Sequence, residues 1–275
     1  MNSLGFTIGT CAAAMMLCAS FAGSAQDSVQ PARSAGDLKT VFAAQGIHID
    51  VEKGLCTIPA RVLVRDDLLE YLLVNPHGQT HESMFVTEVV PSVLNVALLA
   101  LGVKPGRNTS WVAREPAPSP EEIKDGVSPY TVVPPQGDAF YFYAAWRAGD
   151  ETYFYRVEDL VLDRSTGQTM RRHKWVYLGS RLVKPRADKQ EEAFAADLEG
   201  NLVNVALFDQ GNTLVTAALE ECTKQTIWMT NFWLVPPRDA QVELIFSREK
   251  LAVLPSAVEA RLPVVSVEAP PQDER

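Results

Sequence analysis

The sequence lacks the short motifs on which the common enzyme and cofactor classes depend. It contains no Gly-x-Gly-x-x-Gly segment and no P-loop, so the usual support for a nucleotide cofactor is missing. It contains no Gly-x-Ser-x-Gly elbow, the usual setting of a hydrolase serine. It also contains no Cys-x-x-Cys pair, which disfavours a thiolate-bound metal or an iron–sulfur cluster. We therefore predict no cofactor. The missing motifs also disfavour enzymatic activity, although they do not exclude it.

An excess of basic residues is missing as well. The chain of 275 residues carries 25 Lys and Arg against 34 Asp and Glu, a formal net charge of −9. Binding to nucleic acid through phosphate contacts requires a basic surface. We therefore predict no nucleic-acid partner.

Long hydrophobic runs are missing except at the N-terminus. Gly5 to Phe21 contains no charge, and small residues follow it up to Ala25. This order is typical of a secretory signal peptide, so we predict a leader at 1–25 and export to the periplasm or the extracellular space. The stretch before Gly5 has no Lys or Arg, and the alternative is an uncleaved N-terminal segment that tethers the protein to a membrane. No other run is long enough to span a bilayer, so no span is expected after removal of the leader.

Cysteine is scarce outside this leader. Only Cys56 and Cys222 remain in the rest of the chain. In an exported protein they could form one disulfide, which would contribute about 4–5 kcal/mol in the chain-entropy model because the loop is long. The alternative is a pair of buried free thiols, and the sequence leaves both open.

Most of the remaining chain shows the patterns of short strands. About ten segments are rich in β-branched and aromatic residues and are bounded by Gly, Asn, Asp or Pro. Two hairpins are predicted, one around the Pro and Gly cluster at 75–80 and one around Gly149. One strong helix is predicted from Pro91, with Ser92 as its N-cap and Gly102 after its end. Because this helix has almost no polar side chains, we expect it to be buried on most sides.

The fold class expected from these elements is α+β, mainly an antiparallel β-sheet with one buried apolar helix. Prolines are concentrated at 104–136, where we expect a long surface excursion and no domain boundary. A flexible lead-in is predicted at 26–36 and a single domain at 37–249. The Pro- and Val-rich stretch 250–275 reads as a weakly ordered tail.

The leading polar candidates follow the first predicted hairpin turn. His81, Glu82 and Ser83 stand together at the start of the returning strand. Neighbours on a strand point to opposite faces, so His81 and Glu82 are expected to diverge and to hydrogen-bond the hairpin. A turn could also bring His77 towards His81 and Glu82, but a catalytic zinc needs three protein ligands and an open position. A metal site or a hydrolytic site here is therefore the less favoured interpretation.

Aromatic side chains gather in the second predicted hairpin. Tyr141, Tyr143, Tyr153 and Tyr155 can share one face of it, with phenylalanines on the other. An exposed tyrosine face could bind a sugar or a peptide, whereas core packing would leave only the hydroxyl groups at its edge. Both interpretations stay open.

Adjacent charges elsewhere are expected to be solvated. The pair Glu158 and Asp159 and the run 171–174, which contains His173, have the composition of exposed turns. Catalysis by paired carboxylates would require two groups across a cleft, and adjacency does not provide this.

The stretch from His81 to Gly106, HESMFVTEVVPSVLNVALLALGVKPG, resembles the YdjY-type domain family. Members show a His-Glu-Ser after a strand and then a proline-led apolar helix that ends in Leu-Gly and Pro-Gly. The later segments KWVYLGSRLV and EGNLVNVALFD are similar to the family's Trp-x-x-x-Gly-Ser and Gly-Asn-Leu segments. The matching positions are His81, Glu82, Ser83, Gly102, Pro105, Gly106, Trp175, Gly179 and Ser180.

The resemblance implies export, which is typical of the family, and it implies no particular activity. Some relatives carry ferredoxin-like labels, but the clustered cysteines of such a centre are missing here, so no redox role is carried over. We therefore expect a module that binds a ligand or an envelope or extracellular partner. The alternative is a metal-dependent or hydrolytic enzyme centred on His81 and Glu82.

Overall fold

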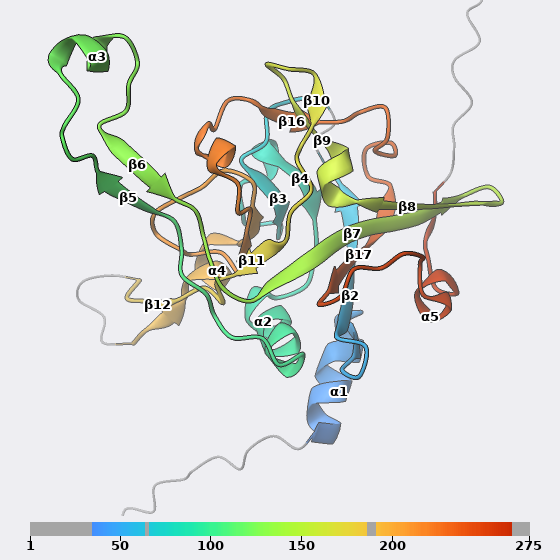
Figure 1. The fold of residues 1–275 in the computed structure, drawn as a ribbon. Coiled ribbons are helices and arrows are strands. Elements are labelled where there is room, and N and C mark those ends of the chain that lie inside the picture. Colours follow the sequence, from blue (N-terminus) through green and yellow to red (C-terminus); the bar gives the residue numbers. More distant parts are fainter. Residues whose placement is uncertain (1–34, 64–65, 186–190, 266–275) are drawn as a thin grey trace, which may run out of the picture.

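The computed structural model describes residues 35–63, 66–185 and 191–265 (Figure 1). The predicted leader at 1–25 lies outside these residues. Of the predicted lead-in at 26–36 only the last two residues are described, and they begin helix α1.

The main feature is a β-sheet that closes on itself. Its eight strands follow the order β2, β17, β7, β11, β15, β14, β3 and β4, and β4 pairs with β2 again. Their bounds are Leu55–Val62 (β2), Tyr71–Val74 (β3), Ser83–Val86 (β4), Ala139–Ala148 (β7), Trp175–Tyr177 (β11), Asn201–Asn204 (β14), Val215–Thr216 (β15) and Gln241–Ser247 (β17). Most neighbours are antiparallel, while β3 with β4 and β14 with β15 are parallel.

Further strands attach to this sheet or form small sheets beside it. Attached to it are β1 (His48–Asp50) on β2, and β8 (Glu151–Arg156) and β18 (Val264–Val265) on β7. The small sheets consist of β9 (Val161–Asp163), β10 (Gln168–Thr169) and β16 (Trp228–Thr230); β12 (Leu182–Val183) and β13 (Ala193–Phe194); and β5 (Ser110–Ala113) and β6 (Tyr130–Val133).

Helices are short in the described part of the chain. The α-helices are α1 (Ala35–Ala44), α2 (Pro91–Ala100), α3 (Pro120–Lys124), α4 (Ala195–Glu199) and α5 (Ser256–Glu259). Three 3₁₀ turns are η1 (Thr80–Glu82), η2 (Val157–Leu160) and η3 (Glu220–Thr223). Within the described ranges, no helix combines the length and the hydrophobicity needed to cross a membrane.

Strand alternation places the main core inside the closed sheet. On β17, Val242, Leu244 and Phe246 point inward and are fully or almost fully buried, while the residues between them point outward. Phe246 stacks on Phe142 of β7 with ring centroids 4.2 Å apart and meets Phe140 edge-on at 5.9 Å. This aromatic cluster fills the interior beneath β7 and β17.

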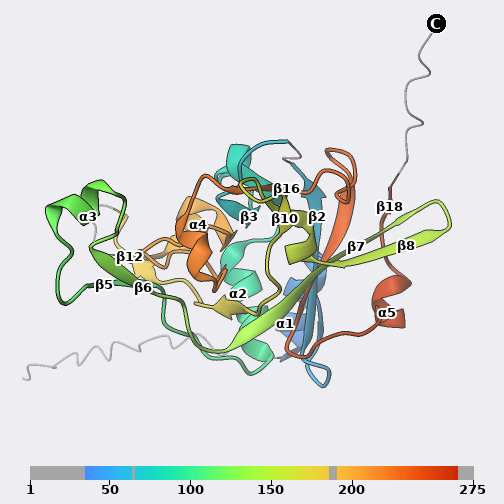
Figure 2. The same ribbon diagram turned by 45° about the horizontal axis from the view of Figure 1, so that its top comes forward.

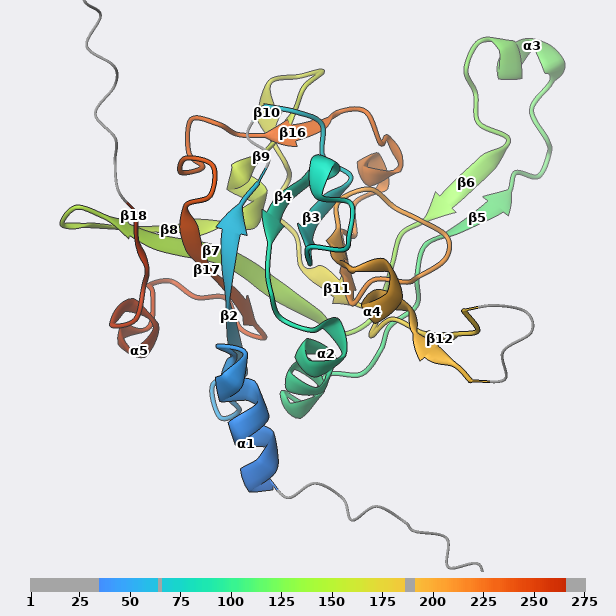
Figure 3. The ribbon, with the colours of Figure 1, turned by 180° about the vertical axis from the view of Figure 1, so that it is seen from behind.

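Helix α2 lies at one end of the closed sheet, beside α1 and α4 (Figure 3). It buries Leu94 and Leu98, but Val96 and Leu99 are exposed, so the prediction of a helix buried on most sides is only partly correct. The predicted Ser92 N-cap is wrong, because Pro91 already occupies the first turn. The Ser92 amide instead donates to Oδ1 of Asp197 on α4, at 2.8 Å. A side chain 105 residues away thus caps this helix.

The Pro-rich excursion at 104–136 forms a two-stranded arm that projects from the rest of the fold (Figure 1). Helix α3 at its tip begins with a capping box between Ser119 and Glu122. Trp111, Val112 and Tyr130 on the arm are exposed. Strand pairing along the arm explains how a Pro-rich stretch keeps a defined path.

The segment 250–265 contradicts the prediction of a weakly ordered tail. Helix α5 and strand β18 lie beside the β7–β8 hairpin (Figure 2). Val258 and Leu262 are buried in a second apolar cluster with Tyr143 and Ile245 on the outer face of the sheet. Burial of these apolar side chains offsets the conformational entropy that the segment loses when it becomes ordered. The predicted tail beyond 265 lies outside the described residues.

The first predicted hairpin is also wrong. Strands β3 and β4 are neighbours, but they run parallel, with Tyr71 opposite Ser83 and Val74 opposite Val86. The turn after β3 and the 3₁₀ turn η1 carry the chain back before β4 begins. The second predicted hairpin, β7–β8 around Gly149, is confirmed, with φ +58° at that glycine.

Candidate functional site

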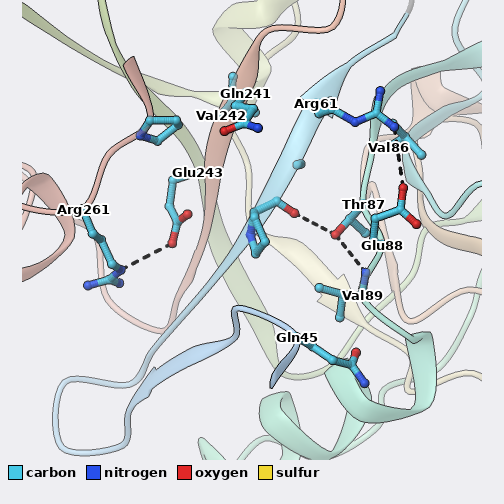
Figure 4. A pocket seen from close by; sticks show the side chains of 13 residues that line it. Gln45, Arg61, Val86, Thr87, Glu88, Val89, Gln241, Val242, Glu243 and Arg261 are labelled. Carbon is cyan, nitrogen blue, oxygen red and sulfur yellow. Dashed lines mark hydrogen bonds and ion pairs between the residues drawn. The ribbon is translucent and has the colours of Figure 1, made fainter. Parts of the chain in front are cut away.

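A cleft with a volume of about 360 Å³ opens on the outer face of the closed sheet (Figure 4). Strands β2 and β17 form its floor, the segment 86–89 forms one wall, and Arg261 and Pro263 form the other. Its exposed lining surface is mainly apolar, although seven of the thirteen lining residues are polar or charged. A ligand site usually combines an apolar surface with polar groups that orient the ligand. The lining residues are Gln45, Pro59, Ala60, Arg61, Val86, Thr87, Glu88, Val89, Gln241, Val242, Glu243, Arg261 and Pro263.

The cleft exists because one edge of β2 changes its partner. That edge pairs with β1 at Leu55–Thr57 and with β4 at Arg61 and Val62, which leaves Pro59 between them. Proline has no amide hydrogen, so the gap in the strand pairing leaves no backbone donor unpaired at this position. The Pro59 carbonyl accepts from the Thr87 hydroxyl at 2.7 Å. The backbone at the gap is therefore satisfied within the chain.

Glu243 is the most unusual side chain of the cleft. It lies on β17 between two inward-facing residues, so its carboxylate points to the outer face, yet the residue is only 6% exposed. Its buried Oε1 atom has no donor of the described protein within hydrogen-bond distance. The nearest cation is Arg261, whose Nε lies 3.6 Å from that oxygen (Figure 4).

Arg261 is held in place by contacts other than Glu243. Its Nη2 donates to Oγ1 of Thr57 at 2.8 Å, and its Nη1 donates to the carbonyl of Ala257. Its Nε is buried and has no acceptor among the described protein atoms at hydrogen-bond distance. The cleft thus contains an acceptor and a donor that face each other without forming a proper hydrogen bond.

Burial raises the pKa of Glu243 above the ordinary glutamate value, and Thr57 and Arg261 oppose this shift without cancelling it. The folded chain therefore binds this proton more tightly than the unfolded chain. The carboxyl favours folding most at a pH below its unfolded pKa of about 4.3, and this contribution is lost as the pH rises through the unfolded and then the folded pKa.

We expect the Glu243→Gln variant to be more stable than the unmodified protein at pH 7, because the amide cannot ionise. The difference in the free energy of unfolding should shrink as the pH falls towards about 4, where the carboxyl is protonated in the unfolded chain too. Urea unfolding at several pH values measures this difference. A difference that does not change with pH would contradict burial as the cause.

The charges on the cleft walls balance. Arg61 pairs with Glu88 at 3.6 Å and with Asp239 at 3.2 Å. Arg61 and Arg261 oppose Glu88 and Glu243 among the lining residues, so the lining has no net formal charge. Gln45 accepts from the Val90 amide through Oε1 at 2.8 Å.

His81, Glu82 and Ser83 do not form the extended segment that the sequence predicts. His81 and Glu82 lie in the 3₁₀ turn η1, and only Ser83 belongs to β4. As a result the two side chains meet, with Nε2 of His81 3.4 Å from Oε1 of Glu82, although His81 is 70% exposed. Ser83 is buried and donates to the carbonyl of Gln79 at 2.6 Å, so its hydroxyl supports the turn.

The position of η1 depends on a close backbone contact. A side chain added at Gly78 would meet the Gly200 carbonyl at 2.6 Å, and the Gln79 amide donates to Oδ1 of Asn201 at 3.0 Å. Next to η1, burial and the nearby Glu82 carboxylate raise the pKa of Glu70.

Metal binding by His77, His81 and Glu82 gains no geometric support. The His77 amide donates to Oδ1 of Asn75 at 2.9 Å, which holds the turn. Among the described residues, no group of three or more His, Cys, Asp or Glu side chains is placed to hold a metal ion.

The four tyrosines of the β7–β8 hairpin lie on two faces, so the prediction of one shared face is wrong. Tyr153 pairs opposite Trp146 and stacks on it at 5.6 Å, and Tyr155 packs against the same ring. Tyr143 is buried on the other face, where its hydroxyl accepts from the Leu251 amide at 2.8 Å. Tyr141 shares that face and lies under the Arg156 guanidinium at 5.1 Å.

The solvated interpretation of the 158–159 and 171–174 charges is wrong for two members. Glu158 is completely buried and binds Arg156 through two hydrogen bonds, one of them from Nε at 3.0 Å. The His173 amide and Trp175 Nε1 also donate to Glu158, at 3.2 and 3.3 Å. Burial lowers the pKa of His173, while Glu158 acts in the opposite direction. Asp159 instead pairs at the surface.

Cys56 and Cys222 are free thiols buried in the main core, so the structure contains no disulfide between these two described residues. Burial raises the pKa of Cys222 to about 12 and that of Cys56 as well. Such thiols stay protonated and unreactive at neutral pH.

Sequence reasoning missed the pair that distinguishes the cleft. Glu243 is the single charged residue in the predicted strand AQVELIF, and Pro59 interrupts another strand; both were available signals. Arg261 gave no signal, because it lies in the stretch interpreted as a tail.

Residues 47–247 match the YdjY domain. No curated protein matches the chain. No solved structure matches it either.

Proposed function

Since the chain belongs to the YdjY domain family, we propose that it is an exported module whose outer-face cleft binds a small ligand. Export rests on the uncharged segment Gly5–Phe21 and the small residues up to Ala25. Binding rests on the cleft between β2, β17 and Arg261.

The observation that carries the proposal is the unsatisfied Oε1 of Glu243. A buried acceptor without a hydrogen bond costs about 1–3 kcal/mol, and native proteins retain few such groups. Buried polar groups without a hydrogen-bond partner are concentrated at functional sites. A cleft of about 360 Å³ is also large enough for a small ligand.

A fragment screen by protein-observed NMR tests this proposal. The library should contain neutral, anionic and cationic compounds, and we expect at least one to shift the backbone signals of Thr87, Val89 and Gln241. The Pro59→Phe variant should fill the cleft and abolish those shifts. Val253→Phe, at an exposed position away from the cleft lining, is the matched control and should bind normally. The absence of any fragment in the cleft of the folded protein would refute the proposal.

The alternative function is a metal-dependent or hydrolytic enzyme centred on His81 and Glu82. One observation favours it: the two side chains meet at 3.4 Å, beside Glu70 with its raised pKa. Such a cluster could exchange protons with a substrate. Bound metal or hydrolytic activity that is lost in His81→Ala and kept in His77→Ala would support this alternative. Equal values in both variants would count against it.

A further inference from the structure

The geometry points to an uncharged, polyhydroxylated ligand, a saccharide, in the cleft, with a hydroxyl group that bridges Glu243 Oε1 and Arg261 Nε. This inference rests on the proposed function and specifies its ligand. The two protein atoms need complementary partners, since the carboxylate oxygen accepts and the Nε–H group donates. A hydroxyl group can donate and accept through one oxygen atom.

The distance between these atoms suits such a bridge. They are 3.6 Å apart, which is too long for a good direct hydrogen bond. An oxygen atom at about 2.8–3.0 Å from each of them fits this separation. Both atoms are covered in this structure, so the hydroxyl group enters only when the two side chains shift. Two neighbouring hydroxyl groups of a sugar ring could also serve one atom each.

The charge of the cleft selects against ionic ligands. Arg61 is already paired with Glu88 and Asp239, and Arg261 stands opposite Glu243. A cationic ligand at Glu243 would approach Arg261, and an anionic ligand at Arg261 would approach Glu243. Either would meet a like charge in a poorly solvated place.

The backbone of the cleft selects against an added peptide strand. Strand addition uses free amide and carbonyl groups at a sheet edge. At the gap in β2, Pro59 has no amide hydrogen, and Thr87 already occupies its carbonyl. Recognition must therefore come from side chains. Pro59 and Pro263 offer apolar surfaces for the C–H groups of a sugar ring.

Calorimetric titration of the purified protein tests the inference with matched probes. The hydroxylated probes are methyl α-D-glucopyranoside, methyl α-D-mannopyranoside, N-acetyl-D-glucosamine and maltose. The ring compounds without hydroxyl groups are cyclohexanecarboxamide, cyclohexylamine and cyclohexanecarboxylate. We expect at least one saccharide to bind with saturation and to shift the NMR signals of Thr87 and Val89, and we expect no binding of the two charged cyclohexanes.

Variants identify the atoms involved. Glu243→Met keeps the side-chain volume and removes the acceptor, so it should weaken saccharide binding at least about tenfold. Glu249→Met removes an exposed carboxylate outside the cleft lining and should leave the affinity within about twofold. Thermal unfolding of each variant separates a binding loss from misfolding. Equal losses in both variants would overturn the hydroxyl bridge.

Failure of the inference and failure of the proposed function give different results. If no saccharide binds but cyclohexanecarboxamide or another fragment occupies the cleft, the ligand class is wrong and the binding function stands. If neither saccharides nor fragments bind to the folded protein, both are wrong.

Discussion

The Glu158→Ala variant is expected to unfold with a free energy about 3–5 kcal/mol smaller than that of the unmodified protein. The substitution leaves the Arg156 guanidinium, which is 8% exposed, without its carboxylate partner. It also removes the acceptor of the His173 amide and of Trp175 Nε1. A buried cation that loses its counter-ion keeps its desolvation penalty, and this accounts for the size of the loss. Urea unfolding followed by fluorescence measures it.

The neighbouring Asp159 provides a matched control. It pairs with Arg172 at 2.7 Å, but the Arg172 side chain is largely exposed. Surface ion pairs of this kind contribute about 0.2–1 kcal/mol, so Asp159→Ala should change stability little. Similar losses for the two variants would show that Glu158 is not buried as described.

A double substitution distinguishes the contribution of the ion pair to stability from that of the packing around it. Arg156→Met with Glu158→Met removes both charges and retains apolar volume. We expect this double variant to recover most of the stability that Glu158→Ala loses, because no unpaired charge remains buried. A double variant as unstable as the single one would indicate that packing against Tyr141 and Tyr143 dominates instead.

The Phe246→Ala variant is expected to lose about 3–5 kcal/mol of unfolding free energy. Phe246 is fully buried inside the closed sheet, stacked on Phe142 and edge-on to Phe140. Truncation would leave a cavity that strands paired on both sides cannot close. Phe246→Leu should cost clearly less, since it leaves a smaller cavity.

Trp233 is the control for this prediction. It is also a large aromatic residue, but it is 80% exposed, so Trp233→Ala should change stability by about 0.5 kcal/mol or less. Denaturant midpoints and slopes of the three variants can be compared directly. If Phe246→Ala lost as little unfolding free energy as Trp233→Ala, the result would contradict the packing of Phe246 in an aromatic interior of the closed sheet.

Local patterns predicted the elements better than their partners. The β7–β8 hairpin, the helix from Pro91 and the excursion at 104–136 follow from glycine, proline and hydrophobic periodicity, which act within a few residues. The parallel pairing of β3 with β4 does not follow, because the turn residues at 75–78 are compatible with a hairpin. Closure of the sheet by β2 and β4 depends on contacts between distant segments as well.

The candidate site illustrates the same limit. Thr57, Glu243 and Arg261 come from three distant parts of the chain, and Arg261 comes from a stretch without a strand or helix signal. Conversely, His81 and Glu82 were found by their adjacency, but the 3₁₀ turn that makes them meet depends on the Gly78–Gly200 contact. The residue types indicated which side chains could take part in a site, but they did not indicate which of these side chains lie close together.

By itself, the amino-acid sequence determined the family, the α+β composition, the apolar helix and the absence of the common catalytic motifs, because these depend on local residue order. Only the tertiary structure decided that the sheet closes, that Glu158 is buried and that Glu243 faces Arg261 across a cleft. The physical reason is that burial and charge pairing are properties of the space between distant segments. The distances between these segments are fixed only once the strands have paired.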